Sequence, residues 1–308
     1  MRVAFFGTPA FALPALHALP RAGFDVCAVV TPPDRPRGRG HDRLEPPPVA
    51  ASARDLGLRV LQPESPRTPG FREELAGLSP DALVVVAYGH LIPDALVAVA
   101  PRGAWNVHPS LLPRWRGPAP VHRTVWAGDP EAGVSIMRLV AKMDAGPVAA
   151  SERTPVGPHE TRGQLEARLA AVGAALLVRV LGQVADGNVT VMEQDEAAAT
   201  YAGVFAPVER ELRWDRPADE LDRLVRALAP APGAWMSVRN ERVKVLEALP
   251  GFASAAPGTL VERDPQGAWL VACRPGGLWL RRVQPEGKGP MTMDAFVAGR
   301  RLNPGDAL

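Results

Sequence analysis

The strongest constraint on the fold is an alternation of short apolar runs with helix-like segments in the first third of the sequence. Residues 3–6 and 24–30 form two such runs, and residues 11–19 between them place apolar side chains at helical spacing. Two more runs, at residues 82–87 and 103–108, follow Ala-rich segments. This alternation predicts an α/β fold with a doubly wound, mostly parallel sheet, in which ligands bind beyond the carboxyl ends of the strands.

The length and composition of the chain predict two domains. With 308 residues, of which 46% are hydrophobic, the chain can bury one large core and a smaller one. We expect a catalytic domain over residues 1–188, a linker over 189–207 and a C-terminal domain over 208–308. In the last of these, a helix near residues 218–228 precedes short apolar runs that predict strands of a small barrel. These runs are residues 243–248, 258–261, 269–272 and 278–283.

Other features of the sequence favour a cytoplasmic protein. The N-terminus has the pattern of a strand and a turn, which predicts no signal peptide, and no apolar run approaches the roughly 20 residues of a membrane helix. Cys27 and Cys273 stand alone in apolar runs, which is typical of buried, unreactive thiols in a reducing compartment. We expect a monomer. The formal net charge is +2, so a surface for an anionic partner must come from local charge.

The main alternative at the level of the fold is a nucleotide-binding Rossmann enzyme. Such an enzyme needs a turn of the pattern G-x-G-x-x-G after its first strand, whereas residues 7–11 read Gly-Thr-Pro-Ala-Phe. A metal enzyme is a second alternative. The sequence predicts no metal, because the histidines outside the motif described next lack metal-ligand spacing. They are His17, His41, His90, His122 and His159.

Residues 105–117, Trp-Asn-Val-His-Pro-Ser-Leu-Leu-Pro-Arg-Trp-Arg-Gly, carry the clearest signs of chemistry. Asn106 and His108 are two residues apart at the predicted end of a strand, so their side chains point to the same side. An amide donor and a titratable imidazole then face one cavity. Pro109 and Pro113 restrict the backbone that follows, which predicts a rigid loop beside a site. A loop His beside an Asn in a turn is the structural alternative.

The pattern Asn-x-His-x-Ser-Leu-Leu-Pro at residues 106–113 resembles that of the 10-formyltetrahydrofolate-dependent formyltransferases. The preceding Ala-Tyr-Gly-His-Leu-Ile-Pro at residues 87–93 and the later Asp-Ala-Gly at residues 144–146 belong to the same resemblance. It covers nearly the whole chain and implies an OB-like barrel at the C-terminus. Motifs at residues 6–9, 33–40 and 112–117 narrow it to the methionyl-tRNA formyltransferases. Three positions depart from the family pattern: Ala50, Pro147 and Val204.

The resemblance implies catalytic roles for three residues. Formyl transfer to an amine requires a neutral amine, stabilisation of an oxyanion and a route for protons. A substrate α-amino group, whose pKa is about 7.7 to 8.0 in peptides, supplies the nucleophile itself. The catalytic Asn, His and Asp of the family correspond to Asn106, His108 and Asp144. The Asn would donate to the oxyanion, the His would relay the proton and the Asp would orient the imidazole.

The resemblance also implies a site for the co-substrate, 10-formyltetrahydrofolate. A folate ring needs an apolar slot with main-chain groups at its edge. A core strand explains residues 84–86 equally well, but it does not explain the Tyr-Gly and Ile-Pro pairs that follow. The residues expected to line the slot are Val86, Tyr88, Gly89, Leu91, Ile92, Pro93, Ser110, Leu111, Leu112 and Pro113.

Local positive charge indicates where tRNA would bind. Residues 32–44 carry four arginines among glycines and prolines. The segment from Arg223 to the C-terminus contains 12 basic and 7 acidic residues. Guanidinium groups are suited to phosphate contacts, although a basic loop by itself is usually only a solvated excursion. The residues expected to contact tRNA are Arg35, Arg37, Arg39, Arg43, Arg114 and Arg116.

These patterns predict an enzyme that moves a formyl group from 10-formyltetrahydrofolate to the α-amino group of methionyl initiator tRNA. Two alternatives stay open. A formyltransferase or formyltetrahydrofolate hydrolase acting on a small molecule shares the catalytic motif but should lack a basic C-terminal barrel and the basic segment at residues 32–44, which we call the arm. A tRNA-binding protein with an inactive site would keep the arm and lose turnover.

Overall fold

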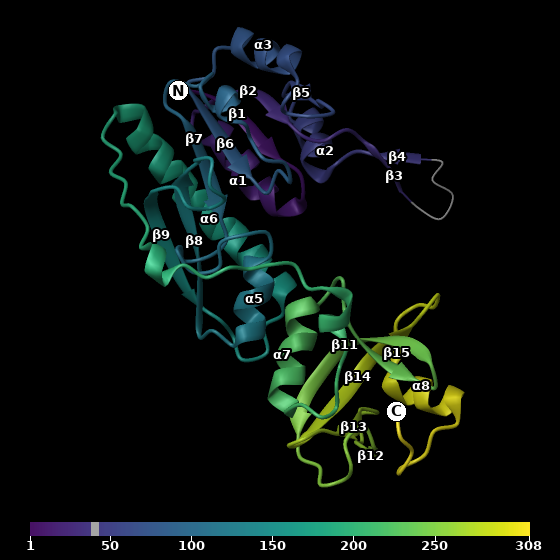
Figure 1. The fold of residues 1–308 in the computed structure, drawn as a ribbon. Coiled ribbons are helices and arrows are strands. Elements are labelled where there is room, and N and C mark those ends of the chain that lie inside the picture. The colour runs from purple at the N-terminus through teal and green to yellow at the C-terminus, as the bar shows by residue number, and fades with distance from the viewer. Residues whose placement is uncertain (38–42) are drawn as a thin grey trace. The chain divides into compact units, whose positions relative to one another are not determined.

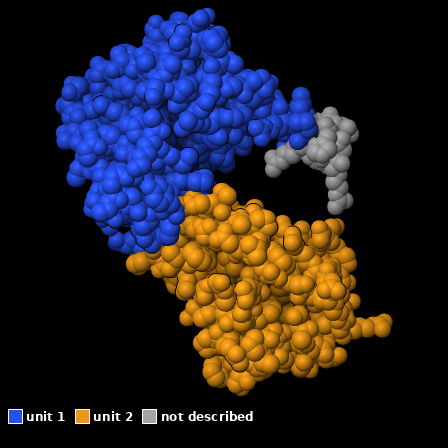
Figure 2. Space-filling model, in the orientation of Figure 1, with its two compact units in different colours: residues 1–120, 131–155, 166–201 blue, residues 121–130, 156–165, 202–308 orange. Residues whose placement is uncertain are grey.

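The computed structural model describes residues 1–37 and 43–308, which form the two compact units coloured in Figure 2. Unit 1 comprises residues 1–120, 131–155 and 166–201. Unit 2 comprises residues 121–130, 156–165 and 202–308, so two short segments from the middle of the chain pack with the C-terminal part. The functional boundaries at residues 188 and 208 stay a prediction.

Unit 1 is built on a seven-stranded sheet with the order β5-β2-β1-β6-β7-β8-β9 (Figure 1). The first five of these strands are parallel, and β8 and β9 run antiparallel to their neighbours. The strands are β1 (Arg2–Gly7), β2 (Asp25–Val30), β5 (Val60–Leu61), β6 (Ala82–Val86), β7 (Ala104–His108), β8 (Glu131–Arg138) and β9 (Val148–Pro155). The doubly wound, mostly parallel sheet is confirmed, and the antiparallel pair is an addition that we did not predict.

Helices cover this sheet on its apolar faces. They are α1 (Leu13–Arg21), α2 (Pro48–Asp55), α3 (Pro69–Gly77), α4 (Asp94–Val97) and most of α6 (Arg162–Asp186), with the short 3-10 turns η1 (Ala10–Ala12) and η2 (Glu196–Ala198). By length and composition α6 could cross a membrane, but 50% of its apolar window is buried inside the fold, as in a core helix. Gly173 of α6 lies so close to β7 that an added Cβ would be 2.9 Å from a methyl group of Val107.

Unit 2 is built on a six-stranded antiparallel sheet with the order β10-β11-β14-β13-β12, in which β15 pairs with β14. The strands are β10 (Ala234–Val238), β11 (Glu241–Gly251), β12 (Leu260–Arg263), β13 (Trp269–Ala272), β14 (Gly277–Pro285) and β15 (Met291–Thr292). The prediction of a smaller C-terminal domain of short strands is confirmed, and its sheet is antiparallel. The pairings of the described residues leave β10 and β12 as edge strands, so closure into an OB-like barrel is not among them.

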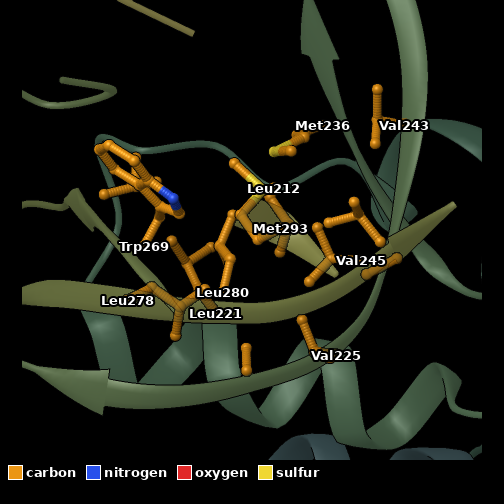
Figure 3. Close-up of a cluster of buried hydrophobic side chains, with 14 of the residues drawn as sticks. Leu212, Leu221, Val225, Met236, Val243, Val245, Trp269, Leu278, Leu280 and Met293 are labelled. Carbon is orange, nitrogen blue, oxygen red and sulfur yellow. The ribbon is translucent and has the colours of Figure 1, made fainter. Parts of the chain in front are cut away.

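A buried apolar cluster forms the core of unit 2. Leu221 and Val225 of α7 (Ala218–Leu228) pack with Val245 and Leu280 of the sheet, as Figure 3 shows. The helix presents one apolar face because Leu221, Leu224, Val225 and Leu228 recur at helical spacing. The remaining elements of this unit are nearly all of α5 (Pro120–Ala127), the turn η3 (Pro207–Arg210) and α8 (Met293–Arg300).

Candidate active site

The carboxyl ends of three neighbouring parallel strands bring the motif residues to one edge of the sheet. β1 ends at Gly7 beside Val86, the last residue of β6, and β6 pairs with β7, which ends at His108. The hydroxyl of Thr8, just after β1, donates a 2.7 Å hydrogen bond to the main-chain oxygen of Tyr88. The loops after β1, β6 and β7 therefore share the edge at which open α/β sheets bind ligands.

Asn106 and His108 lie on the side of β7 that faces away from α6. Successive residues of a strand face opposite sides, and Val107 is the residue that packs against Gly173 of α6. His108 is 4% exposed, whereas Asn106 is partly exposed. Within the described part of the chain the Asn106 carboxamide has no hydrogen-bonding partner, so its two N–H donors are available to a ligand.

The ring of His108 lies between two oxygen acceptors. Its Nε2 is 2.9 Å from the main-chain oxygen of Trp115, and its Nδ1 is 3.7 Å from a carboxylate oxygen of Asp144. The first distance is a hydrogen bond and the second is too long for one, so Asp144 acts on the ring through its charge. A carbonyl oxygen can only accept, so Nε2 carries a proton in this arrangement.

Asp144 is held in an uncommon backbone conformation. Its φ is 50°, in the left-handed region that non-glycine residues rarely adopt. The second carboxylate oxygen accepts a 2.8 Å hydrogen bond from the N–H of Gly117. In the same turn, a Cβ added at Gly146 would lie 1.9 Å from the carbonyl oxygen of Arg138, so this position requires glycine. The Asp-Ala-Gly pattern therefore has a steric basis as well as a chemical one.

The loop after β7 is stiffened by hydrogen bonds to β8. Ser110 is buried, and its hydroxyl donates a 2.6 Å hydrogen bond to the main-chain oxygen of Arg114. The hydroxyl of Ser135 donates to the main-chain oxygen of Ser110 at 2.8 Å and accepts from the N–H of Leu112 at 3.2 Å. Leu111, Leu112 and Pro113 remain partly exposed. Of this part of the predicted folate slot, the structure therefore offers Leu111 to Pro113 as a surface and uses Ser110 as internal support.

The rest of the predicted folate slot also divides by burial. Val86, Tyr88 and Ile92 are buried, whereas Gly89 is exposed and Leu91 is 49% exposed. Pro93 is partly exposed. The buried residues hold the end of β6 in the core, and the exposed ones can offer main-chain groups and an apolar side chain to a ligand.

A cavity of about 360 Å³ opens beside the loop that follows β6. Its walls include Thr8, Tyr88, Gly89, His90 and Arg35, together with prolines from the two ends of the arm. Among the described residues, no three His, Cys, Asp or Glu side chains are grouped to hold a metal ion. The prediction of an enzyme without a metal stays a prediction.

The predicted basic arm is a hairpin at its described ends. β3 (Arg35–Arg37) and β4 (Arg43–Glu45) pair antiparallel, with Arg35 opposite Glu45 and Arg37 opposite Arg43. Arg35 is exposed. Arg39, also predicted to contact tRNA, lies outside the described residues.

Arg114 and Arg116, which we expected to behave alike, differ in burial. Arg114 is exposed, whereas Arg116 is 1% exposed and donates hydrogen bonds to Gln194 at 3.0 Å and Glu196 at 2.9 Å. Contrary to the prediction, Arg116 therefore does not offer its guanidinium to tRNA in this structure. Hydrogen bonds from Arg116 and then Lys142 lower the pKa of Glu196 to about 2.

The sequence analysis missed the segment that contacts this site from beyond α6. Gln194 and Glu196 bind Arg116, and the hydroxyl of Thr200 accepts a 2.9 Å hydrogen bond from the N–H of Trp115. We had included this segment in the linker. The available signal was the polar run Glu-Gln-Asp-Glu at residues 193–196, which is unusually dense in hydrogen-bonding side chains for a linker.

The sequence matches two protein families that follow each other along the chain. Residues 1–181 match the Formyl transferase family, and residues 206–301 match the formyl transferase C-terminal domain. A methionyl-tRNA formyltransferase of Xylella fastidiosa is 45% identical over 304 residues, which are 98% of this chain and 98% of that protein. Another, from Roseobacter denitrificans, is 43% identical over 305 residues, which are 99% of this chain and 98% of that protein.

Solved structures share the fold at low sequence identity. HypX from Aquifex aeolicus in complex with tetrahydrofolic acid aligns with a TM-score of 0.66 at 17% identity, over 97% of this chain and 47% of HypX, so this chain spans about half of that protein. An N-formyltransferase from Helicobacter canadensis, in complex with folinic acid and dTDP-3-aminofucose, aligns with a TM-score of 0.67 at 14% identity, over 92% of this chain and 98% of that one. By the family matches and the full-length relatives, the chain belongs to the formyl transferase family and, within it, to the methionyl-tRNA formyltransferases.

Proposed function

We propose that the protein transfers the formyl group of 10-formyltetrahydrofolate to the α-amino group of methionine on initiator tRNA. One observation carries the proposal: the free Asn106 carboxamide and the His108–Asp144 pair lie at the ligand-binding edge of a formyl transferase sheet. The folate supplies the formyl carbon, and this chain supplies oriented donors and a proton carrier.

In the proposed reaction His108 transfers the protons, and Asp144 contacts its ring. As the amine nitrogen bonds to the formyl carbon it must lose a proton, and the departing folate nitrogen must gain one. A neutral His108 can accept the first proton and a charged His108 can donate the second. The carboxylate of Asp144, 3.7 Å from Nδ1, is placed to orient the ring.

Asn106 stabilises the charge that develops on the formyl oxygen. When the amine adds to the formyl carbon, the former carbonyl oxygen becomes an oxyanion. The carboxamide of Asn106 is neutral, partly exposed and unpaired among the described residues, so its N–H groups can turn to that oxygen without first breaking a hydrogen bond. One donor in such a position is typically worth about 3–4 kcal/mol in the transition state.

The finer assignments concern where the two substrates bind. For the folate, we propose the exposed surface formed by Gly89, Leu91 and residues 111–113, because it combines main-chain groups with apolar side chains. For the tRNA, we propose the arginines of the β3–β4 hairpin and Arg114. Arg35 lines the cavity that also includes Gly89, so an acceptor end held by the hairpin would reach the same edge of the sheet.

A formyltransferase for a small molecule is the second candidate, because an N-formyltransferase in complex with dTDP-3-aminofucose shares the fold. The basic hairpin favours tRNA, since a small acceptor does not need a row of phosphate-binding groups. The full-length similarity to methionyl-tRNA formyltransferases, which includes unit 2, favours the same substrate.

The proposal is tested by supplying purified protein with 10-formyltetrahydrofolate and methionyl initiator tRNA. We expect formylmethionyl-tRNA to accumulate over many turnovers. The matched control is the same charged tRNA with its α-amine acetylated, which should take up no formyl group. Failure to formylate the unblocked tRNA, with the protein folded and folate bound, would reject this function.

A further inference from the structure

A segment of ten residues after α6, residues 192–201, binds both loops of the active site. Met192 pairs with Val148 of β9 through two main-chain hydrogen bonds of 2.8 and 2.9 Å. At the other end, the N–H of Thr200 donates to Pro113 and its main-chain oxygen accepts from the N–H of Arg116 at 2.8 Å. We call residues 192–201 the bracing segment.

Gln194 links the bracing segment to the turn that carries Asp144. Its Nε2 donates to the main-chain oxygen of Asp144 at 2.9 Å and to that of Gly146 at 2.7 Å. The first of these carbonyl groups belongs to Asp144 itself, whose side chain faces His108, and the second lies two residues further along the turn. Because a left-handed φ is unfavourable for a non-glycine residue, contacts outside the turn must hold Asp144 in place.

Arg116 holds Gln194 in the orientation that this contact needs. The side-chain oxygen of Gln194 accepts from Nε of Arg116 at 3.0 Å, which fixes the amide nitrogen toward the turn. Glu196 accepts from Nη2 of the same guanidinium and also from Lys142, next but one to Asp144. Arg116 is 1% exposed, and its Nη1 is buried without a partner among the described residues. Burying the charged guanidinium of Arg116 in this way costs desolvation free energy, so we expect this residue to have a role other than keeping the protein soluble.

We propose that Arg116 and Gln194 are positioning residues that hold the 142–146 turn so that the carboxylate of Asp144 faces His108. This inference rests on the proposed formyl transfer, because it assigns the two residues to that reaction. They act through Asp144 and do not touch either substrate. The chain of contacts runs from the guanidinium to the Gln194 oxygen, from the Gln194 amide to the turn, and from the Asp144 carboxylate to the imidazole.

A double-mutant cycle between Gln194→Met and Asp144→Asn tests the inference. Methionine keeps the length of the side chain and removes its hydrogen bonds. We expect Gln194→Met alone to lower kcat with methionyl-tRNA by about 10–100-fold, with the KM values for both substrates nearly unchanged. In the Asp144→Asn background, the same substitution should cost less than about threefold, because the carboxylate it positions is already gone.

A second measurement does not depend on turnover. The Hε1 resonance of His108, assigned through His108→Gln, should shift in the same direction in Gln194→Met as in Asp144→Asn. Arg116→Met should have the same effect, and Gln194→Met keeps the test available if that variant does not fold. The matched control is Arg226→Met, which breaks the ion pair with buried Asp222 in unit 2 and should leave the resonance in place.

The outcomes separate the inference from the proposed function. Equal losses of kcat in both backgrounds of the cycle, or a His108 resonance unmoved by Gln194→Met, would overturn the positioning role. A wild-type protein that fails to formylate methionyl-tRNA would reject the proposed function alone, since the resonance measurement still decides whether Gln194 positions Asp144. A shift of the resonance together with a non-additive cycle supports both.

Discussion

The carboxylate of Asp144 lies 3.7 Å from Nδ1 of His108, although the two residues are 36 positions apart in the chain. His108 ends β7, whereas Asp144 occupies a strained turn after β8 that is tied to the loop after β7 by the hydrogen bond from the N–H of Gly117 to the Asp144 carboxylate. At this distance the interaction is one of charge and not a hydrogen bond, so its strength depends on where the turn holds Asp144.

Removing either member of this pair should stop catalysis and leave the fold intact. His108→Ala removes the proton carrier, and Asp144→Asn keeps the shape of the side chain but loses its charge. We expect each to lower kcat by about 100–10,000-fold, the usual range for general acid-base groups, with thermal unfolding close to that of the wild type. Parallel measurements of kcat and Tm check this. Near-normal turnover in either variant would remove that residue from the mechanism.

Asn106→Ala should lower kcat by about 100–1,000-fold with little change in folate affinity. The carboxamide has no partner among the described residues, so its loss breaks no internal hydrogen bond, and the effect should appear mainly in the transition state. Steady-state kinetics with a separate titration of folate binding measure the two quantities. A large rise in the folate Kd at unchanged kcat would make Asn106 a binding residue instead.

Replacing Arg35, Arg37, Arg39 and Arg43 with Ser should weaken tRNA binding and make it less sensitive to salt. Each lost phosphate contact makes the negative slope of log K against log salt shallower by about 0.7–0.9, so the loss of four contacts would make it shallower by about 3. Folate binding should not change. The control is the pair Arg153→Ser and Arg179→Ser, two exposed arginines that pair with Glu131 and Glu152. Parallel salt slopes for the arm variant and the wild type would exclude ionic contact between the hairpin and RNA.

His122, which is partly buried, should make the protein less stable in mild acid. Burial, then the charges of Arg162 and Arg123, lower the pKa of His122 from 6.5 to about 4. Below pH 6.5 the imidazole of His122 binds a proton in the unfolded chain but stays neutral in the folded chain. The free energy of unfolding is therefore at its full value above this pH and decreases as the pH falls toward 4. We expect His122→Asn to flatten the dependence of Tm on pH across this window, whereas exposed His90→Asn should not. An unchanged profile for His122→Asn would assign the acid sensitivity to other groups.

The parallel sheet could be predicted because each of its strands is a local pattern. An apolar run such as residues 82–86 is buried on both faces, so its composition alone indicates a strand. β9 was not predicted because several of its residues are exposed and polar, as the run Ser-Glu-Arg-Thr at 151–154 shows. Its pairing depends on β8 and not on its own composition.

The placement of the candidate site residues could be predicted from their motifs, but the contacts that support them could not. Asn106 and His108 lie on the same side of β7 because strand geometry alternates at every residue. Arg116 stands in the same motif and resembles a phosphate-binding arginine, yet it is enclosed by Gln194 and Glu196 from 78 and 80 positions later. Contacts over such a separation depend on how the chain returns after α6, which no local pattern encodes.

The most direct test of the account compares three acceptors at a fixed concentration of 10-formyltetrahydrofolate. Charged initiator tRNA, charged elongator tRNA and glycinamide ribonucleotide are each supplied to the wild-type protein, and kcat/KM is measured for formyl uptake. We predict rapid transfer to methionyl initiator tRNA, slower transfer to the elongator, and none above background to the ribonucleotide. Transfer to the ribonucleotide at a rate equal to or above that for initiator tRNA would contradict the account and identify a small-molecule formyltransferase.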